Sequence, residues 1–243
     1  MSTALVTGAS AGIGREFARQ LAGQGHRVIA VARDTDRLRS LTDALGPGHT
    51  PVAADLTTPE GRQRVTDVLD GERVHLLVNN AGAAVPGAFG TAPLPHTLAM
   101  LHLNCEALVT LAHRFVARAE PGDSLLNVSS TLAFAPMPNL SVYAATKAFV
   151  TSFSESLWHE HKDRGVYVMG LCPGMTATES QPHTGDDVPA GLVQTPERVV
   201  RTALAALRRR KHPTVISGRR NTLFAAAART LPRRTVLHML SKG

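Results

Sequence analysis

A tyrosine and a lysine that could exchange a proton with a substrate, Tyr143 and Lys147, lie four positions apart in the sequence. On a helix this spacing places both side chains on one face, a single turn apart. A phenol has a pKa of about 10 and is a poor acid-base catalyst at neutral pH until a nearby ammonium stabilises its phenolate. Ser130, thirteen residues before the tyrosine, could donate a hydrogen bond to a substrate oxygen on which negative charge develops. Each residue alone is uninformative, but together they could move a proton to or from a substrate oxygen.

A glycine-rich turn near the amino end has the composition of a phosphate-binding site. It follows a predicted strand and opens a predicted helix, so its glycines allow close backbone approach while the helix N-terminus offers free N–H groups to a pyrophosphate. Its spacing, G-x-x-x-G-x-G, differs from the common G-x-G-x-x-G pattern, and a turn used only for packing is the alternative. The turn consists of Thr7, Gly8, Ala9, Ser10, Ala11, Gly12, Ile13 and Gly14.

The residues that follow the second and third predicted strands bear on the choice of nucleotide. NAD sites usually place an acidic residue after the second strand to bind the ribose 2′-hydroxyl, whereas Arg33 at this point offers a cation to a 2′-phosphate. This favours NADP(H), although Arg33 could also be a solvated surface residue beside Asp34. Asp55, just after the third strand, is the expected acceptor for the adenine amino group, or else a loop residue.

The elements that would position these residues alternate between strand and helix. The strand candidates are mostly continuous apolar runs, which is typical of parallel strands covered on both faces. A chain of 243 residues with 43% hydrophobic content can bury one sizeable core, so we expect a single domain over residues 1–243. The predicted fold is α/β, a Rossmann-like doubly wound parallel sheet of about seven strands in a three-layer α/β/α arrangement. The strands are expected at about 3–7, 27–31, 50–54, 74–79, 124–129, 166–171 and 213–216.

Local signals mark several boundaries of the helices. Gly23 and Gly25 close the first helix, and Thr58-Pro59-Glu60 opens the third with a cap and a proline in its first turn. Thr195-Pro196-Glu197 repeats this opening signal near the end of the chain. Residues 179–192 are polar and interrupted by prolines and glycines, which predicts a lid over the site.

Two adjacent asparagines, Asn79 and Asn80, end the fourth predicted strand and precede Ala81 and Gly82. Ligands of open α/β sheets bind at the carboxyl ends of the strands. We therefore expect this segment to face a ligand and not to fill the core.

Taken together, these motifs resemble the classical short-chain dehydrogenase/reductase family, in order and at the usual spacing, over residues 3–217. The resemblance implies that Tyr143 is the general acid/base, that Lys147 lowers its pKa and binds the nicotinamide ribose, and that Ser130 polarises the carbonyl. It also implies that Asn104 holds a water for proton relay. The matching motifs are the glycine-rich turn, Asp55, Asn79-Asn80-Ala81-Gly82, Asn104, Ser130, Tyr143-x-x-x-Lys147 and Pro173-Gly174.

The same resemblance completes the expected cofactor site. Residues 31–38 and 145–150 resemble the NADP(H)-using branch of the family, which contains many bacterial reductases and relatives of hydroxysteroid dehydrogenases. Thr176 and Thr178 match positions that contact the carboxamide, although Thr176 departs from the usual aliphatic residue. The expected NADP(H) contacts are Gly8, Ser10, Gly12, Ile13, Gly14, Arg33, Asp55, Leu56, Asn80, Ala81, Gly82, Tyr143, Lys147, Pro173, Gly174, Thr176 and Thr178.

The predicted activity is hydride transfer between NADP(H) and a carbonyl or secondary alcohol, with reduction of an apolar ketone favoured. The reverse oxidation, or an epimerisation that combines both, is the alternative within enzymes. A catalytically idle NADP(H)-binding regulator or scaffold, using the basic carboxyl end, is the alternative outside them. Several apolar residues could line the substrate pocket or belong equally to the core, namely Phe89, Phe134, Met137, Pro138 and Leu140.

Basic charge is concentrated at the carboxyl end of the chain. The net charge is +7, and residues 198–243 hold twelve of the 26 Lys and Arg residues but no Asp or Glu. After Gly218, apolar residues recur at helical spacing, so an extension at about 218–243 could contact anionic lipid, nucleic acid, a second subunit or its own protein. Docking on its own protein is favoured, and nucleic acid is not expected because no aromatic residues interleave the charges. The apolar positions are Leu223, Phe224, Ala227, Ala228 and Leu231.

Other sequence features exclude several classes of protein. The amino end lacks a signal peptide and no apolar run approaches the ~20 residues that span a bilayer, so a cytoplasmic location is expected.

Cys105 and Cys172 are predicted to be buried free thiols. No metal is expected, because His159 and His161 are two residues apart and point to different sides of a helix. The resemblance implies a homodimer or homotetramer.

Overall fold

The computed structural model describes residues 2–178 and 193–240, and the predicted lid lies outside these residues. In the described part, one sheet has the strand order β3-β2-β1-β4-β5-β6-β7, and every pair of neighbours is parallel. The strand order reverses between β1 and β4, and ligands of open α/β sheets bind at the carboxyl ends of the strands beside such a reversal. The strands are β1 (Thr3–Thr7), β2 (Arg27–Ala32), β3 (Thr50–Ala53), β4 (Leu76–Asn79), β5 (Ser124–Val128), β6 (Tyr167–Cys172) and β7 (Thr214–Ile216).

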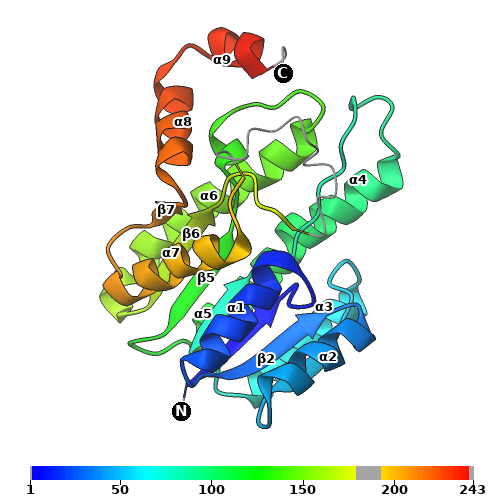
Figure 1. The fold of residues 1–243 in the computed structure, drawn as a ribbon, viewed down its shortest axis with the longest axis vertical. Coiled ribbons are helices and arrows are strands. Elements are labelled where there is room, and N and C mark those ends of the chain that lie inside the picture. Colours follow the sequence, from blue (N-terminus) through cyan, green and yellow to red (C-terminus); the bar gives the residue numbers. More distant parts are fainter. Residues whose placement is uncertain (1, 179–192, 241–243) are drawn as a thin grey trace.

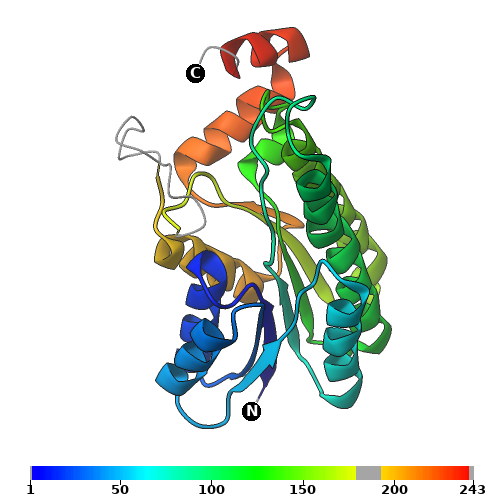
Figure 2. The same cartoon turned by 90° about the vertical axis from the view of Figure 1, so that its right-hand side faces the viewer.

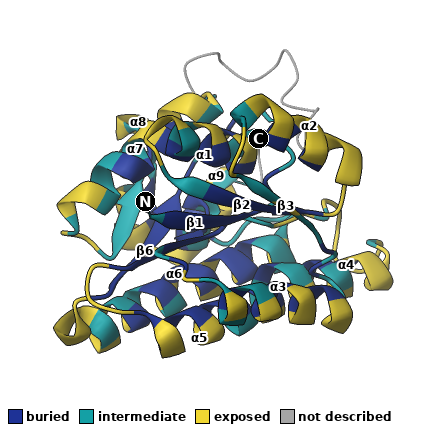
Figure 3. Ribbon diagram, turned by 90° about the horizontal axis from the view of Figure 1, so that it is seen from below, coloured by how far each residue is buried: buried dark blue, intermediate teal, exposed yellow. Residues whose placement is uncertain are grey.

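Helices cover both faces of the sheet, so the predicted three-layer α/β/α fold is confirmed (Figures 1 and 2). The sheet between them is largely buried (Figure 3). Each face has its own apolar cluster, built on one side around Phe17 and on the other around Phe115. The first layer contains α1 (Gly12–Gly23), α2 (Thr35–Leu45) and α7 (Pro196–Arg209), and the second contains α3 (Pro59–Gly71), α4 (Leu94–Leu101), α5 (Leu108–Arg118) and α6 (Ser141–His161).

The boundary signals in the sequence act as predicted. The Thr58 side chain accepts a hydrogen bond from the Gly61 N–H at the start of α3, and the Thr195 side chain accepts one from the Arg198 N–H at the start of α7. Such caps satisfy N–H groups that the helix itself leaves without partners. Every strand begins and ends within two residues of its predicted limits. Local chemistry therefore decides where most elements start and stop.

Two further helices, α8 (Arg219–Thr230) and α9 (Arg233–Leu240), pack on the carboxyl edge of the sheet (Figure 1). The helix predicted after Gly218 is confirmed, and of its predicted apolar positions Ala228 is buried and Phe224 packs against the same cluster, whereas Leu223 is 73% exposed. The small residues Ala225 and Ala228 form this cluster with Phe134 and Cys172. Alanines let the α8 backbone approach this part of the protein more closely than leucines would.

Both cysteines are free thiols, as predicted, but only Cys172 is fully buried and Cys105 is half-buried. None of the helices within residues 2–178 and 193–240 is both long and apolar enough to cross a lipid bilayer.

Candidate active site

The glycine-rich turn is shaped to receive a phosphate at the start of α1. Gly8 and Gly12 have φ angles of +66° and +53°, a conformation that favours glycine. Ala11 occupies the cap position of α1 and makes no side-chain hydrogen bond there, unlike the capping residues of α2, α3 and α7. The N–H groups of the first turn of α1 are therefore left to an anionic ligand, and the pyrophosphate of a dinucleotide fits this cradle.

The end of β4 is tied directly to this turn. The Asn80 side-chain amide donates to the Thr7 carbonyl at 2.9 Å, and the backbone N–H groups of Asn80 and Ala81 both donate to Thr7 Oγ1 at 2.9 Å. A Cβ atom at Gly14 would overlap the Gly8 carbonyl oxygen and the Asn80 side chain. Thr7 thus joins the turn to the end of β4, a role that its place in the motif did not reveal.

The other asparagine of the pair, Asn79, does not face a ligand. Its side-chain amide is buried and donates to Asn127 Oδ1 at 3.1 Å and to the Leu108 carbonyl at 3.3 Å. It links β4 to β5 and α5. The expectation that both asparagines serve a ligand is therefore wrong for Asn79, because side chains alternate along a strand and its position points into the core.

The residues expected at the adenine end lie after β2 and β3. Asp55 Oδ1 accepts hydrogen bonds from the Thr57 N–H at 3.0 Å and the Thr57 hydroxyl at 2.7 Å. Burial raises the pKa of Asp55, but these bonds and the nearby charge of Arg33 outweigh it, so the net pKa is lowered. Leu56 is buried and its side chain packs in the core. Asp55 is thus an ionised acceptor with Arg33 in its vicinity.

The acidic neighbour of Arg33 is committed to a structural role. The Asp34 carboxylate caps α2 by accepting from the Arg37 N–H at 3.0 Å, and it pairs with the Arg37 guanidinium at 3.3 Å. Arg33 itself is exposed. This arrangement leaves Arg33, and not Asp34, as the residue suited to meet a nucleotide ribose.

A buried arginine that the sequence did not single out connects the adenine end to the catalytic region. Arg62 Nη1 donates to the Leu56 and Thr57 carbonyls at 3.2 and 3.0 Å. Its Nη2 pairs with the Glu106 carboxylate at 2.7 Å. Glu106 also pairs with His102 Nδ1 at 2.6 Å. No short motif marks this arginine, because its partners come from separate parts of the chain.

Asn104 lies in the π-helical segment η1 (His102–Ala107), a kind of irregularity that is frequent at functional sites. Its Oδ1 accepts from the Ala83 N–H at 2.9 Å, and its amide donates to the Ala83 carbonyl at 2.9 Å and to Thr146 Oγ1 at 3.1 Å. The side chain therefore fastens the loop after β4 to α6. Its expected part in proton relay stays a prediction.

The lysine and tyrosine meet at the carboxyl end of β5, as their spacing predicts. The Lys147 side chain is buried, and its ammonium donates to the Val128 carbonyl at 2.9 Å and lies 5.6 Å from the centroid of the Tyr143 ring. A Cβ atom at Gly82 would lie 3.2 Å from Asn104 Oδ1 and 3.3 Å from Lys147 Nζ. The asparagine and the lysine therefore both lie against this glycine.

The two serines after β5 have different partners. The Ser129 hydroxyl donates to the Lys147 carbonyl at 2.7 Å and lies 2.7 Å from Thr151 Oγ1, so it fastens α6 to the sheet. The Ser130 side chain accepts from the Leu132 N–H at 3.1 Å and lies close enough to Tyr143 to lower the pKa of that phenol. This difference supports Ser130 as the serine of the catalytic group.

Burial controls the acid-base properties of the tyrosine and the lysine. It raises the pKa of Tyr143, and the interaction with Ser130 lowers that pKa only part of the way back. Burial also lowers the pKa of Lys147, to about 8, against the opposing effect of two cysteines. The net shift of the Tyr143 pKa is upward because desolvation disfavours the phenolate, and the expected lowering of this pKa by Lys147 stays a prediction. Tyr143 is thus a protonated phenol at neutral pH.

The lowered pKa of Lys147 predicts a pH-dependent stability. The unfolded chain keeps this proton up to an ordinary lysine pKa of about 10.4, so above about pH 8 the unfolded state binds more protons than the folded state. The free energy of unfolding of the wild type, relative to Lys147→Met, should therefore rise with pH, by about 2 kcal/mol between pH 7.5 and 9.5. Urea unfolding of both proteins at the two pH values measures this. A difference that stays constant with pH would contradict it, and Lys162→Met, which removes an exposed lysine, is the matched control.

The segment after β6 contains the residues expected at the nicotinamide end. The Pro173 carbonyl accepts from the Thr131 N–H at 2.9 Å, and the Thr176 hydroxyl donates to the Gly174 carbonyl at 3.0 Å. A Cβ atom at Gly12 would lie 2.9 Å from a methyl group of Thr178. Thr178 therefore borders the glycine-rich turn, while the Thr176 hydroxyl is already bonded within its own segment.

The expected pocket residues separate into two groups. Phe134 is buried in the cluster beneath α8, so it belongs to the core. Phe89 is 66% exposed, and Met137, Pro138 and Leu140 are partly buried near the carboxyl edge of the sheet. The last four residues stay candidates for substrate contact.

Comparisons with known proteins agree with this geometry. A family model described as short chain dehydrogenase matches residues 2–189. Serine 3-dehydrogenase of Agrobacterium fabrum is 34% identical over 185 residues, which cover 73% of each chain. Solved structures of family members hold NADPH, NADP or NADH.

Two solved structures illustrate the similarity. A short-chain dehydrogenase from Sphingobium yanoikuyae in complex with NADPH has a TM-score of 0.82 and 34% identity, covering 89% of this chain and 87% of that one. A bulky-bulky ketone specific alcohol dehydrogenase from Comamonas testosteroni has a TM-score of 0.80 and 31% identity, covering 89% and 86%. With its sheet order, its assembled motifs and these matches, the chain belongs to the short-chain dehydrogenase/reductase family of oxidoreductases.

Proposed function

We propose that this protein is an NADP(H)-dependent ketoreductase that acts on an apolar small molecule. One observation carries the proposal: Ser130, Tyr143 and Lys147 meet at the carboxyl edge of the sheet, beside a helix N-terminus without a side-chain cap. When bound, NADPH supplies the hydride that reduces the carbonyl carbon. The test is loss of NADPH absorbance in the presence of a panel of ketones, with NADH compared in parallel.

The protein's own residues supply the proton and hold the substrate oxygen. Ser130 donates a hydrogen bond to the carbonyl oxygen, where negative charge develops. Tyr143, kept protonated by burial, gives its proton to that oxygen. The Lys147 ammonium, held by the Val128 carbonyl, stabilises the phenolate that remains. Asn104 keeps the loop after β4 against α6, which fixes the positions of these groups relative to one another.

The preference for NADP(H) is supported by the contrast between Arg33 and Asp34, because the aspartate is used as a helix cap. Arg33→Ala should weaken NADPH binding about 10- to 100-fold, the effect of losing one charge-assisted hydrogen bond to a 2′-phosphate, and leave NADH binding unchanged. Fluorescence titration with both nucleotides measures this. Arg39→Ala, which removes an exposed arginine of the adjacent helix α2, is the matched control. Equal weakening with both nucleotides, or in both variants, would refute the preference.

Reduction of an apolar ketone is the favoured direction and substrate class. Tyr143 is protonated at neutral pH, which is the form that can donate a proton to the substrate oxygen in reduction. The similarity to a ketone-specific alcohol dehydrogenase supports a bulky carbonyl substrate, whereas the similarity to serine 3-dehydrogenase keeps oxidation of a secondary alcohol as the alternative.

An idle regulator or scaffold is less well supported, because Asn104, Ser130, Tyr143 and Lys147 are all present and assembled. A cytoplasmic location, a homodimer or homotetramer, and weak contact of the basic carboxyl end with a membrane surface stay predictions.

A further inference from the structure

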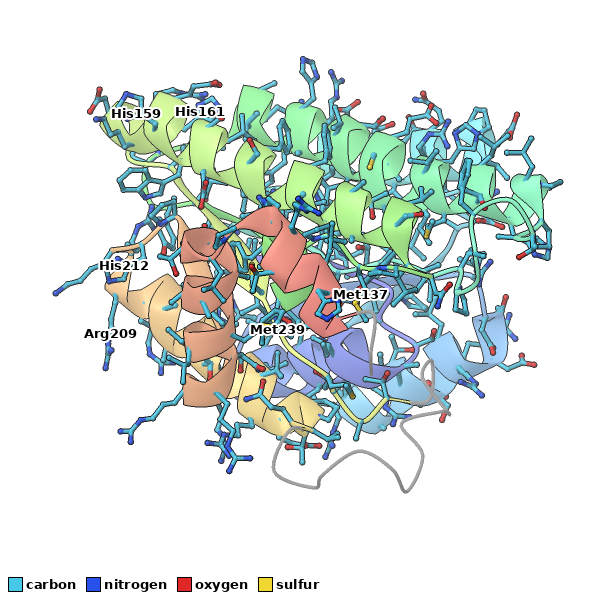
Figure 4. The ribbon with its side chains drawn as sticks, turned by 90° about the horizontal axis from the view of Figure 1, so that it is seen from above. Met137, His159, His161, Arg209, His212 and Met239 are labelled. Carbon is cyan, nitrogen blue, oxygen red and sulfur yellow. The ribbon has the colours of Figure 1, made fainter. Side chains whose placement is uncertain are left out.

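The carboxyl-terminal helices α8 and α9 lie beyond residues 2–189, the part matched by the family model. They sit above the carboxyl edge of the sheet, the edge that holds Tyr143 and Lys147 (Figure 1). Figure 4 views the molecule from above, and Met239 of α9 and Met137 of residues 131–140 both lie on the side facing the viewer. We call residues 131–140 the substrate loop, because they follow the catalytic serine. Helices α8 and α9 thus lie over the edge at which the substrate is proposed to bind.

Arg233, the first residue of α9, bonds to the substrate loop. Its Nη1 donates to the Phe134 carbonyl at 3.0 Å. Phe134 ends the short 3-10 helix η2 (Thr131–Phe134), and Ser130 occupies the cap position at the start of that helix. A single turn of backbone therefore separates the Arg233 contact from the serine that is expected to bond to the substrate oxygen.

Arg229, near the end of α8, contacts Phe134 as well, through the face of its ring. Its guanidinium carbon lies 4.3 Å from the centroid of the Phe134 ring, and its Nη2 lies 3.8 Å from Glu155 Oε1 on α6. Glu155 Oε1 in turn accepts from the Thr214 hydroxyl of β7 at 2.5 Å. Arg229 thus holds the Phe134 ring, while Arg233 holds its backbone carbonyl.

Apolar packing reinforces these polar contacts. Phe134 and Ala135 of the substrate loop form one buried cluster with Ala225 and Ala228 of α8 and Val236 of α9. The inward faces of α8 and α9 therefore pack against the substrate loop. Helices α8 and α9 act here as a support for residues next to the catalytic serine.

We infer that Arg229 and Arg233 are positioning residues for substrate binding: through Phe134 they hold the substrate loop, and with it Ser130, in the arrangement that recognises the ketone. This inference deepens the proposed function, and its expected effect on the KM for the ketone rests on that function. The arginines have no contact with the glycine-rich turn, so the nucleotide should bind equally well without them.

The kinetic test compares Arg233→Ala with Arg234→Ala, its neighbour on α9. Arg233→Ala should raise KM for the ketone about 5- to 20-fold, as expected for losing a hydrogen bond from a charged donor. The Kd for NADPH should stay unchanged, Arg233→Lys should recover part of the affinity, and Arg234→Ala should behave as the wild type. Weakened NADPH binding, or equal effects of the two alanine variants, would overturn the assignment.

A second measurement does not depend on turnover. Hydrogen–deuterium exchange of residues 131–135 should be faster in Arg233→Ala and in Arg229→Ala than in the wild type or Arg234→Ala, while exchange in β5 stays the same. Unchanged exchange in the substrate loop would refute the positioning role. If the wild type reduces no ketone but the loop still exchanges faster, the proposed function fails and the structural support stands.

Discussion

Tyr143→Phe is expected to lower kcat for ketone reduction about 1,000-fold or more, within the range that a positioned acid or base contributes, while NADPH still binds. The variant removes one hydroxyl, which is the proposed proton donor and interacts with Ser130. The aromatic ring stays, so packing around Lys147 is preserved. Steady-state kinetics with a ketone from the substrate panel, together with NADPH titration, measures both quantities.

The matched control is Tyr167→Phe, since the chain has only two tyrosines. The Tyr167 hydroxyl donates to the His212 carbonyl at 2.7 Å, away from the catalytic group. Removing it should cost about 1 kcal/mol of stability and leave kcat unchanged. Should Tyr143→Phe retain substantial turnover, proton transfer by this phenol would be wrong and the reading as an idle nucleotide-binding protein would gain support.

Gly14→Ala is expected to destabilise the protein by about 3 kcal/mol or more and to weaken NADPH binding strongly. The reason is that no space exists for the new methyl group between the glycine-rich turn and the end of β4. The added Cβ would overlap the Gly8 carbonyl oxygen and the Asn80 side chain, neither of which is the free end of a flexible group. Relief requires the glycine-rich turn to move away from β4. Urea unfolding and NADPH titration of the same preparation measure both effects.

Gly23→Ala in the same helix is its control. A Cβ there meets nothing within 4 Å, so the substitution should leave NADPH binding unchanged and stabilise the protein by up to about 1 kcal/mol, as alanine does in a helix. If Gly14→Ala bound NADPH as well as Gly23→Ala does, the close contact between the turn and β4 would not be needed for the nucleotide site.

The contact between Arg62 and Glu106 gives the site a connection that the motifs do not describe. It joins the loop containing Asp55 to the π-helical segment that carries Asn104. The two ends of the expected nucleotide site are therefore held by one buried guanidinium. Interactions at the adenine end can in this way support the geometry at the catalytic end.

The sequence by itself determined the strand positions, the helix caps and the glycine-rich turn, since these depend on residues near one another in the chain. Apolar runs mark parallel strands, Thr58 and Thr195 cap the helices that follow them, and glycine supplies the φ angles that the turn requires. The four-residue spacing of Tyr143 and Lys147 likewise brings their side chains together through helix geometry alone. Local rules are sufficient for these features.

The tertiary structure alone decided which polar residues face the site and which are structural. Asn79 and Ser129 resemble their neighbours in the sequence, yet both are used to join elements, because the pairing of β4, β5 and α6 directs them inward. Burial decided the direction of the pKa shift of Tyr143.

Docking of the carboxyl end on its own protein was predicted, but the residues that make this contact were hidden. Arg233 and Phe134 are 99 residues apart, and Arg62 and Glu106 are 44 apart. Contacts over such separations have no periodicity or spacing that a sequence can display, and they exist only because the sheet brings the ends of its strands to one edge.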